Sequence, residues 1–244
     1  MSRPPMARLD RLLANLGYGS RREVTALVRA GKIVLDGKAL TDPGSKVPVT
    51  ADLPSQMTIH GAPVDPPSPL TLIMNKPLGV VCSHKEAGRS VYELLPHRWR
   101  ARMPGLSTVG RLDKDTSGLL LITDDGAFLH RVISPRNHVI KRYKAQLDRP
   151  LTGDETALFS SGTLMLEGES DPLEPAQLLP TGERSADLII TEGRYHQVRR
   201  MFAAAGNHVI ALHRDQIGGL VLPADLEPGA WRILGLAAQD AIFN

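Results

Sequence analysis

The residues of this chain that are best suited to chemistry lie in one polar loop bounded by glycines. Arg111 and Asp113 stand two apart between Gly110 and Gly118, and the apolar run 119–122 follows directly. Glycine frees the backbone at both ends of the loop, and a short apolar run of this kind suits a buried strand. The pattern presents a carboxylate on a loop held by a rigid scaffold, where function is more common than in a core. Asp113 could equally cap a turn through hydrogen bonds from its side chain to the backbone.

A tyrosine follows in a segment with strand periodicity. Tyr143, Ala145 and Leu147 alternate with the polar residues between them, so they share one face of a predicted strand. A tyrosine on the inner face is most often a core residue, but its hydroxyl can also donate or accept a proton.

A later segment, 195–205, has helical periodicity. Its apolar residues form one stripe, and Arg199 flanks that stripe while His196 and Arg200 are expected to point outward. A flanking arginine can reach into a cleft, although most arginines on helices are solvated.

The elements that must position these side chains follow a small N-terminal unit. Apolar residues recur with helical spacing over 9–16, and a second helix begins at Ser20, which has capping-box spacing to Glu23, and ends at Gly31. A hairpin closes on the tight-turn pair at 36–37. We therefore expect a basic module at 1–60.

The rest of the chain has a different organisation. Residues 61–69 contain four prolines, which predicts a stiff, extended linker. From residue 70 onward, strand-like runs at 72–74, 119–122, 143–147 and 188–191 alternate with turns and occasional helices. This pattern predicts an α+β catalytic domain at 70–244, built around a mixed or antiparallel sheet.

Composition narrows the class of protein. The 244 residues carry a formal net charge of +3, but residues 1–50 hold nine Lys and Arg against four Asp and Glu, a net of +5. A basic module ahead of a near-neutral body suggests a polyanion-binding domain joined to an enzyme. The single cysteine, Cys82, permits no internal disulfide or cysteine-based metal cluster, and we expect it to be a packed strand residue. No segment has the pattern of a signal peptide or a membrane span, so a soluble, cytoplasmic protein is expected.

Four segments of the body, taken together, resemble pseudouridine synthases of the ribosomal branch and occur in that family's order. They are Met-Asn-Lys-Pro-Leu-Gly at 74–79, the loop and strand at 110–126, Lys-Arg-Tyr at 141–143, and Glu-Gly-Arg-Tyr-His-Gln-Val-Arg-Arg-Met at 192–201. The N-terminal order of helix, Ser-Arg-Arg, helix, Gly-Lys and Asp-Gly resembles the RNA-binding module first seen in small-subunit ribosomal protein four.

The resemblance implies a reaction and a set of roles. Uracil is detached from its ribose and rejoined through carbon, without metal or cofactor. The family's indispensable carboxylate falls on Asp113, which acts on the sugar or on the uracil ring. Arg199 matches the basic residue that pairs with that aspartate, which favours the ionised carboxylate. Tyr143 matches the tyrosine that stacks on the target base, and Arg111 the arginine that enters the RNA where the uridine is flipped out.

The resemblance also implies RNA contacts outside the catalytic group. Candidate phosphate contacts in the body are Lys76, Arg136, Arg142 and Lys144, and those in the N-terminal module are Arg8, Arg11, Arg21, Arg22 and Lys32. A solvated basic surface is the alternative interpretation of each of them. The implied partner is ribosomal RNA, free or within a partly assembled small subunit, bound by a monomer.

Two other functions are compatible with parts of the sequence. The pair Asp113 and Asp115 superficially resembles the paired aspartates of haloacid-dehalogenase-type phosphatases, but that motif follows a buried apolar strand and residues 107–111 are not one. A second alternative is an RNA-binding or assembly protein without catalysis. Within the family, residues 134–138 and 201–219 favour small-subunit (16S) over large-subunit (23S) ribosomal RNA as the substrate.

Overall fold

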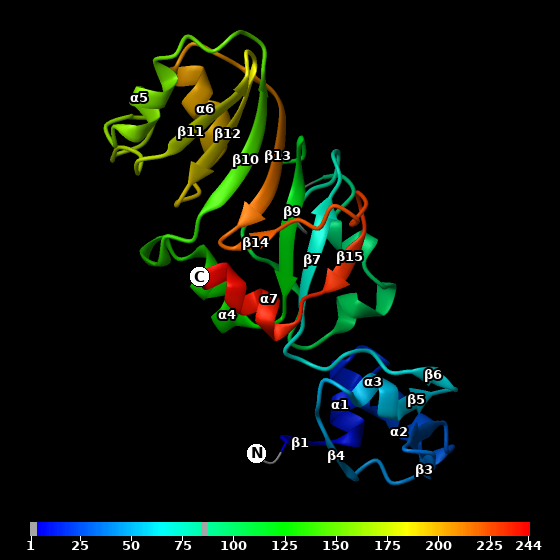
Figure 1. The fold of residues 1–244 in the computed structure, drawn as a ribbon. Helices are drawn as coiled ribbons and strands as arrows, with labels where there is room; N and C mark the ends of the chain where they lie inside the picture. Colours follow the sequence, from blue (N-terminus) through cyan, green and yellow to red (C-terminus); the bar gives the residue numbers. More distant parts are fainter. Residues whose placement is uncertain (1–3, 84–86) are drawn as a thin grey trace. The chain divides into compact units, whose positions relative to one another are not determined.

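The computed structural model describes residues 4–83 and 87–244, which form two compact units. The first unit contains the chain up to Leu70 together with residues 95–107 and 123–125, and the second contains 71–94, 108–122 and 126–244. The predicted division near residues 60–70 is therefore approximate, because two later segments join the N-terminal unit. Figure 1 shows the elements of both units.

The first unit is built from short helices and strands around one apolar core. Its elements are β1 (Met6–Arg8), α1 (Leu9–Asn15), α2 (Arg21–Arg29), β2 (Ile33–Leu35), β3 (Lys38–Leu40), β4 (Lys46–Pro48), α3 (Leu53–Gln56), β5 (Met57–Ile59), β6 (Ala62–Pro63) and the 3-10 helix η2 (His97–Ala101). β3, β2, β5 and β6 pair in that order, and β1 pairs with β4. The predicted capping box is present, because Ser20 Oγ accepts from the amide of Glu23 and the Glu23 carboxylate accepts from the amide of Ser20.

The proline-rich segment 61–69 packs into this unit. Val64 is only 2% exposed and belongs to the apolar core. The backbone amide of Asp65 donates to the hydroxyl of Tyr18 at 2.9 Å, and the Asp65 carboxylate accepts from Arg98 at 2.7 Å. These contacts explain why residues 95–107 belong to the N-terminal unit.

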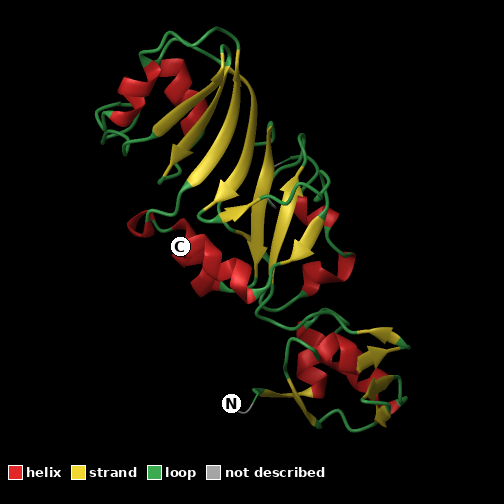
Figure 2. Ribbon diagram, viewed as in Figure 1, coloured by secondary structure: helices red, strands yellow, loops and turns green. Residues whose placement is uncertain are grey.

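The second unit contains one large mixed sheet with helices against it, shown in yellow and red in Figure 2. Its strands are β7 (Thr71–Lys76), β8 (Ser107–Thr108), β9 (Thr116–Thr123), β10 (Lys141–Leu147), β11 (Gln177–Gly182), β12 (Ser185–Ile190), β13 (Val209–Ile217), β14 (Leu220–Val221) and β15 (Trp231–Ile233). Its helices are η1 (Val91–Leu94), α4 (Gly126–Ile133), η3 (Pro135–Asn137), α5 (Glu155–Ser160), α6 (Gln197–Ala204), α7 (Leu236–Asp240) and η4 (Ala241–Phe243). The sheet order is β11-β12-β10-β13-β9-β7-β15, which confirms the α+β fold class.

Two groups of helices cover different parts of this sheet. α5 and α6 lie against β11 to β13, where Phe159 and Phe202 meet edge to face at 5.2 Å. At the other part of the sheet, the rings of Phe128 in α4 and Phe243 in η4 pack at 6.1 Å in a core shared with β9. β10 carries Tyr143, and β13 carries Arg214.

Gly118 allows β9 to pair in parallel with β13. It lies in β9 opposite Arg214 of β13 with φ of +107°, and a Cβ atom there would come 2.1 Å from the carbonyl oxygen of Arg214. Any side chain would separate the two strands. The glycine that bounds the predicted loop therefore sets the approach of β9 to β13.

Candidate active site

The loop that carries Asp113 is fixed by backbone hydrogen bonds on both sides. The amide of Thr116 donates to the carbonyl of Asp113 at 3.1 Å, and the amide of Gly79 donates to the carbonyl of Lys114 at 2.8 Å. The amide of Leu112 donates to Cys82 Sγ at 3.5 Å. Cys82 is buried as predicted, although it lies in a bend outside the named strands. The loop is thus a rigid support for its carboxylate.

Lys76 does not lie where a phosphate contact was expected. Its side chain at the end of β7 is fully buried, and Nζ donates to the carbonyl of Thr116 at 2.8 Å and to that of Pro77 at 3.1 Å. Burial lowers the pKa of Lys76 below its ordinary value. Because both acceptors are main-chain carbonyls next to the Asp113 loop, Lys76 supports that loop instead of facing RNA.

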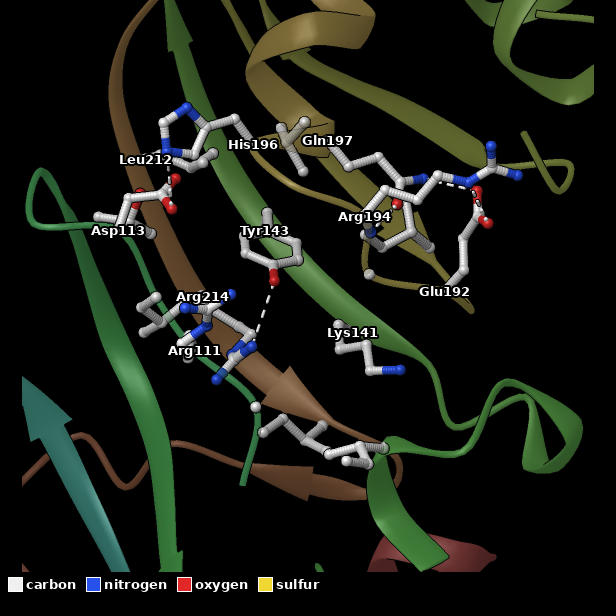
Figure 3. A pocket seen from close by; sticks show the side chains of 18 of the residues that line it. Arg111, Asp113, Lys141, Tyr143, Glu192, Arg194, His196, Gln197, Leu212 and Arg214 are labelled. Carbon is white, nitrogen blue, oxygen red and sulfur yellow. Dashed lines mark hydrogen bonds and ion pairs between the residues drawn. The ribbon is translucent and has the colours of Figure 1, made fainter. Parts of the chain in front are cut away.

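The predicted catalytic residues meet at one cleft of about 200 Å³. Asp113, Tyr143 and Arg199 all line it, as do Arg111 and Arg214. Figure 3 labels Asp113, Tyr143, Arg111 and Arg214. Tyr143 is 9% exposed, and Ala145 and Leu147 are buried on the same face of β10, which confirms the alternation predicted from the sequence.

Asp113 pairs with a histidine that was expected to point outward. His196 Nε2 lies 3.3 Å from Asp113 Oδ1, and both side chains are partly exposed. α6 begins only at Gln197, and His196 precedes it with φ of +49°, so the helical geometry used to place His196 does not apply to it. The left-handed backbone turns the imidazole toward the loop. Tyr195 stacks on this ring with centroids 3.8 Å apart.

Arg199 reaches the same loop at a different carboxylate from the one expected. Its Nη2 lies 3.0 Å from Asp115 Oδ2 and donates to the carbonyl of Asp115 at 3.1 Å, while Nη1 donates to the carbonyl of Val209 at 2.9 Å. The guanidinium therefore joins α6, β13 and the loop. The expected ion pair of Arg199 with Asp113 is replaced here by one with Asp115, because the two main-chain carbonyls fix the direction of the guanidinium.

The opposite side of the cleft contains two further cations to which the sequence assigned no individual role. Arg214 Nη1 donates to the hydroxyl of Tyr143 at 3.2 Å, and Lys141 Nζ donates to the carbonyl of Thr191 at 3.2 Å. Burial, together with the charge of Arg214, lowers the pKa of Lys141 to about 8. In Figure 3, Asp113 with His196 and Arg214 with Lys141 lie on different sides of the Tyr143 ring.

A polar network holds the start of α6. The amide of Arg194 donates to Gln197 Oε1 at 2.9 Å, and the side chains of both residues bind Glu192. Arg194 and Arg200 also form ion pairs with Glu169 at 3.3 and 2.8 Å, so Arg200 holds the loop before β11. The segment that carries His196 and Arg199 is therefore held from both sides.

The remaining predicted contacts in the body differ in their availability. Arg111 and Arg136 are exposed. Arg142 and Lys144 both bind Asp215, at 2.9 and 3.3 Å. Burial acts to raise the pKa of Asp215, but the hydrogen bonds and charges of the two cations outweigh it and hold that pKa below its ordinary value. This carboxylate offsets part of the positive charge on that face of β10.

The N-terminal candidates also divide into two groups. Arg8 and Arg21 bind the buried Asp10 at 3.1 and 2.9 Å. The hydrogen bond from Arg8, joined by one from Arg21, lowers the pKa of Asp10 to about 2. The other three candidates, Arg11, Arg22 and Lys32, are exposed, as Arg8 and Arg21 also are.

Periodicity could have found only some of the residues that it missed. Arg214 follows Leu212 at strand spacing, so alternation placed it on the face of β13 that carries Leu212. His196 had no such signal, because a left-handed residue before a helix breaks the helical pattern. Among residues 4–83 and 87–244, no three His, Cys, Asp or Glu side chains are grouped as they would need to be to hold a metal ion.

Family models match both parts of the chain. A model described as RNA pseudouridylate synthase matches residues 71–204, and a model of the S4 domain matches residues 7–53. Within the described residues, no helix combines the length and the apolar character needed to cross a bilayer.

Curated proteins and a solved structure are similar over nearly the whole chain. The ribosomal small subunit pseudouridine synthase A of Vibrio cholerae is 40% identical and that of Escherichia coli K12 is 39% identical, each over 93% of this chain and at least 95% of the relative. An uncharacterized RNA pseudouridine synthase of Bacillus subtilis, YtzG, is 39% identical over 93% of this chain and 94% of its own length. A crystal structure described as a pseudouridylate synthase is 33% identical with a TM-score of 0.67, covering 96% of this chain and 99% of that chain.

Proposed function

Because the chain belongs to the RNA pseudouridylate synthase family, we propose that it converts a uridine of small-subunit (16S) ribosomal RNA to pseudouridine at the cleft around Asp113. The observation that carries the proposal is the convergence of Asp113, Tyr143 and Arg199 on one cleft in a chain that matches this family. The choice of small-subunit RNA is supported by the names of the relatives from Vibrio cholerae and Escherichia coli.

The geometry supports a distinct role for each side chain. Asp113 presents a carboxylate on a rigid loop and acts on the sugar or the uracil ring of the flipped nucleotide, by covalent attack or by elimination. In either case the N1–C1′ bond breaks, a C5–C1′ bond forms, and uracil loses a proton at C5 and gains one at N1. Tyr143 forms one wall of the cleft and stacks on the base. Arg199 holds the loop through Asp115, and the exposed Arg111 lies at the cleft, where it can take the place that the uridine leaves in the RNA.

His196 is a further partner of the Asp113 carboxylate. When protonated, His196 is a charge-assisted partner for Asp113, and it occupies the position near the carboxylate that the sequence had given to Arg199. Asp113 therefore contacts the His196 imidazole directly, whereas Arg199 acts on it only through Asp115 of the same loop.

The partner and setting form part of the same proposal. The S4 domain at 7–53 binds the ribosomal RNA, free or in a partly assembled small subunit, and the enzyme acts as a monomer in the cytoplasm without a cofactor or metal. Size-exclusion chromatography with light scattering would reveal a dimer if the monomer proposal were wrong.

Pseudouridine mapping tests the function. We expect ribosomal RNA from cells lacking this protein to lose one pseudouridine in the small subunit, restored by the wild-type protein but not by Asp113→Asn. The variant nearly preserves the shape of the side chain while it removes a nucleophilic or basic oxygen, so its fold and RNA binding should persist. A pseudouridine lost from large-subunit RNA instead would show that large-subunit (23S) ribosomal RNA is the substrate. Turnover by Asp113→Asn would contradict the catalytic role of Asp113.

A further inference from the structure

A buried arginine, Arg214, lies at the cleft. Arg214 is 4% exposed and forms no ion pair within the part of the chain that the structure describes, and its Nη2 atom has no hydrogen-bond partner there. Burying a guanidinium without a counter-charge costs free energy. An unsatisfied buried group of this kind in a cleft calls for an explanation beyond packing.

The strand register places Arg214 directly beside Tyr143. Tyr143 of β10 pairs with Arg214 of β13, which in turn pairs with Gly118 of β9. Arg214 Nε donates to the carbonyl of Leu119 at 2.9 Å, and Nη1 donates to the hydroxyl oxygen of Tyr143 at 3.2 Å, as the dashed line in Figure 3 shows. Because the guanidinium is planar, the bond from Nε fixes the direction of Nη1.

This contact decides which way the hydroxyl proton of Tyr143 can point. A phenol oxygen that accepts from a guanidinium keeps its own O–H for another acceptor. Since Tyr143 lines the cleft, a nucleotide bound in the cleft can supply that acceptor. We propose that Arg214 is a positioning residue that holds the Tyr143 hydroxyl and directs its proton toward the target uridine. The inference rests on the proposed function.

A double-mutant cycle in the full-length protein tests the proposal. Turnover number, KM and thermal unfolding are measured on a small-subunit ribosomal RNA transcript for Arg214→Met, Arg214→Lys, Tyr143→Phe and Arg214→Met with Tyr143→Phe. Arg214→Met should lower kcat about tenfold to hundredfold, the worth of a hydrogen bond to a charged group, with KM nearly unchanged. Arg214→Lys should recover part of that loss, and Arg214→Met should cost little more once Tyr143 is Phe. The matched control is Arg232→Met, an exposed arginine of β15 that binds Asp225, which should leave kcat unchanged.

Three results would overturn the proposal. Normal turnover in Arg214→Met would show that the contact is not used, and an undiminished effect of Arg214→Met in the Tyr143→Phe background would show that Arg214 does not act through Tyr143. A loss of kcat that follows unfolding, without recovery in Arg214→Lys, would show a structural role only. If Arg214→Met does not fold, Arg214→Lys with and without Tyr143→Phe completes the cycle. A wild-type protein without turnover on any ribosomal RNA would overturn the proposed function itself.

Discussion

At the scale of single residues, cations in the cleft donate hydrogen bonds to main-chain carbonyls. Lys141 binds the carbonyl of Thr191, and Arg214 binds that of Leu119. A carbonyl fixes the direction of a cation without cancelling its charge. The cleft therefore keeps positive potential that a polyanion such as RNA can use.

Arg199 gives the first prediction at this scale. Arg199→Ala should lower turnover at least about tenfold, because it removes a charge-assisted contact between α6, β13 and the Asp113 loop, whereas RNA affinity should change little. Arg199→Lys should retain part of the activity as a point charge. Single-turnover rates with saturating enzyme compare the turnover of the two variants with that of wild type.

A second variant separates the two contacts that Arg199 makes with Asp115. The Asp115 carboxylate is 68% exposed, so Asp115→Asn should cost at most about 1 kcal/mol, a factor of roughly five in rate. Near-normal turnover in Arg199→Ala would show that the arginine is an ordinary helix charge.

Lys141 gives a prediction about pH and stability. Its folded-state pKa of about 8 lies below the ordinary value of 10.5, so the unfolded chain binds more protons between these two values. The contribution of Lys141 to folding stability should therefore rise as pH increases from about 8 to 10.5, and should be constant below about 8. We expect the free energy of unfolding in urea of the wild type, relative to that of Lys141→Met, to increase between pH 7.5 and 9.5. A constant difference between the two proteins would contradict the lowered pKa.

At the scale of elements, the sequence predicted periodic features and missed breaks in them. The α2 cap at Ser20, the buried stripe of α6 and the inward face of β10 all follow from spacing, and the structure has them. His196 was misplaced because its left-handed backbone lies one residue before α6, where helical angles no longer apply. The partner of Arg199 could not be predicted, since it depends on a carbonyl of β13, a strand that comes ten residues later.

The β9–β13 pairing gives a prediction for one element. Gly118→Ala should destabilise the protein by about 2 kcal/mol or more, because the new Cβ meets the carbonyl oxygen of Arg214 at 2.1 Å and φ is +107°. Turnover should fall as well, since Arg214 must move with its strand. Gly126→Ala in α4 is the matched control, because nothing lies within 4 Å of its Cβ position. Equal unfolding midpoints for the two variants would contradict the close approach.

At the scale of the whole molecule, the sequence predicted both functional parts but not how the N-terminal unit is completed. The expected linker at 61–69 contributes Val64 to a core and Asp65 to a pair with Arg98. Arg102 and Asp124 form a nearly fully buried ion pair in the same unit. Contacts between segments this far apart leave no periodic signal in the sequence. They also mean that deleting residues 1–60 would remove the core against which Val64 packs and the Tyr18 hydroxyl that Asp65 binds.

Charge substitution is therefore a sharper test of RNA binding than truncation. All five N-terminal candidates are exposed, but Arg8 and Arg21 are engaged by Asp10. Replacing Arg11, Arg22 and Lys32 by Gln should weaken binding to small-subunit ribosomal RNA. The slope of log affinity against log salt should fall by roughly one unit for each phosphate that the variant no longer binds. Arg29→Gln, in the last turn of α2, is the control. It shows how much the loss of one positive charge at another position of this unit weakens RNA binding. An unchanged salt slope in the triple variant, with an intact thermal transition, would mean that this surface does not bind phosphate and that the N-terminal unit has another role.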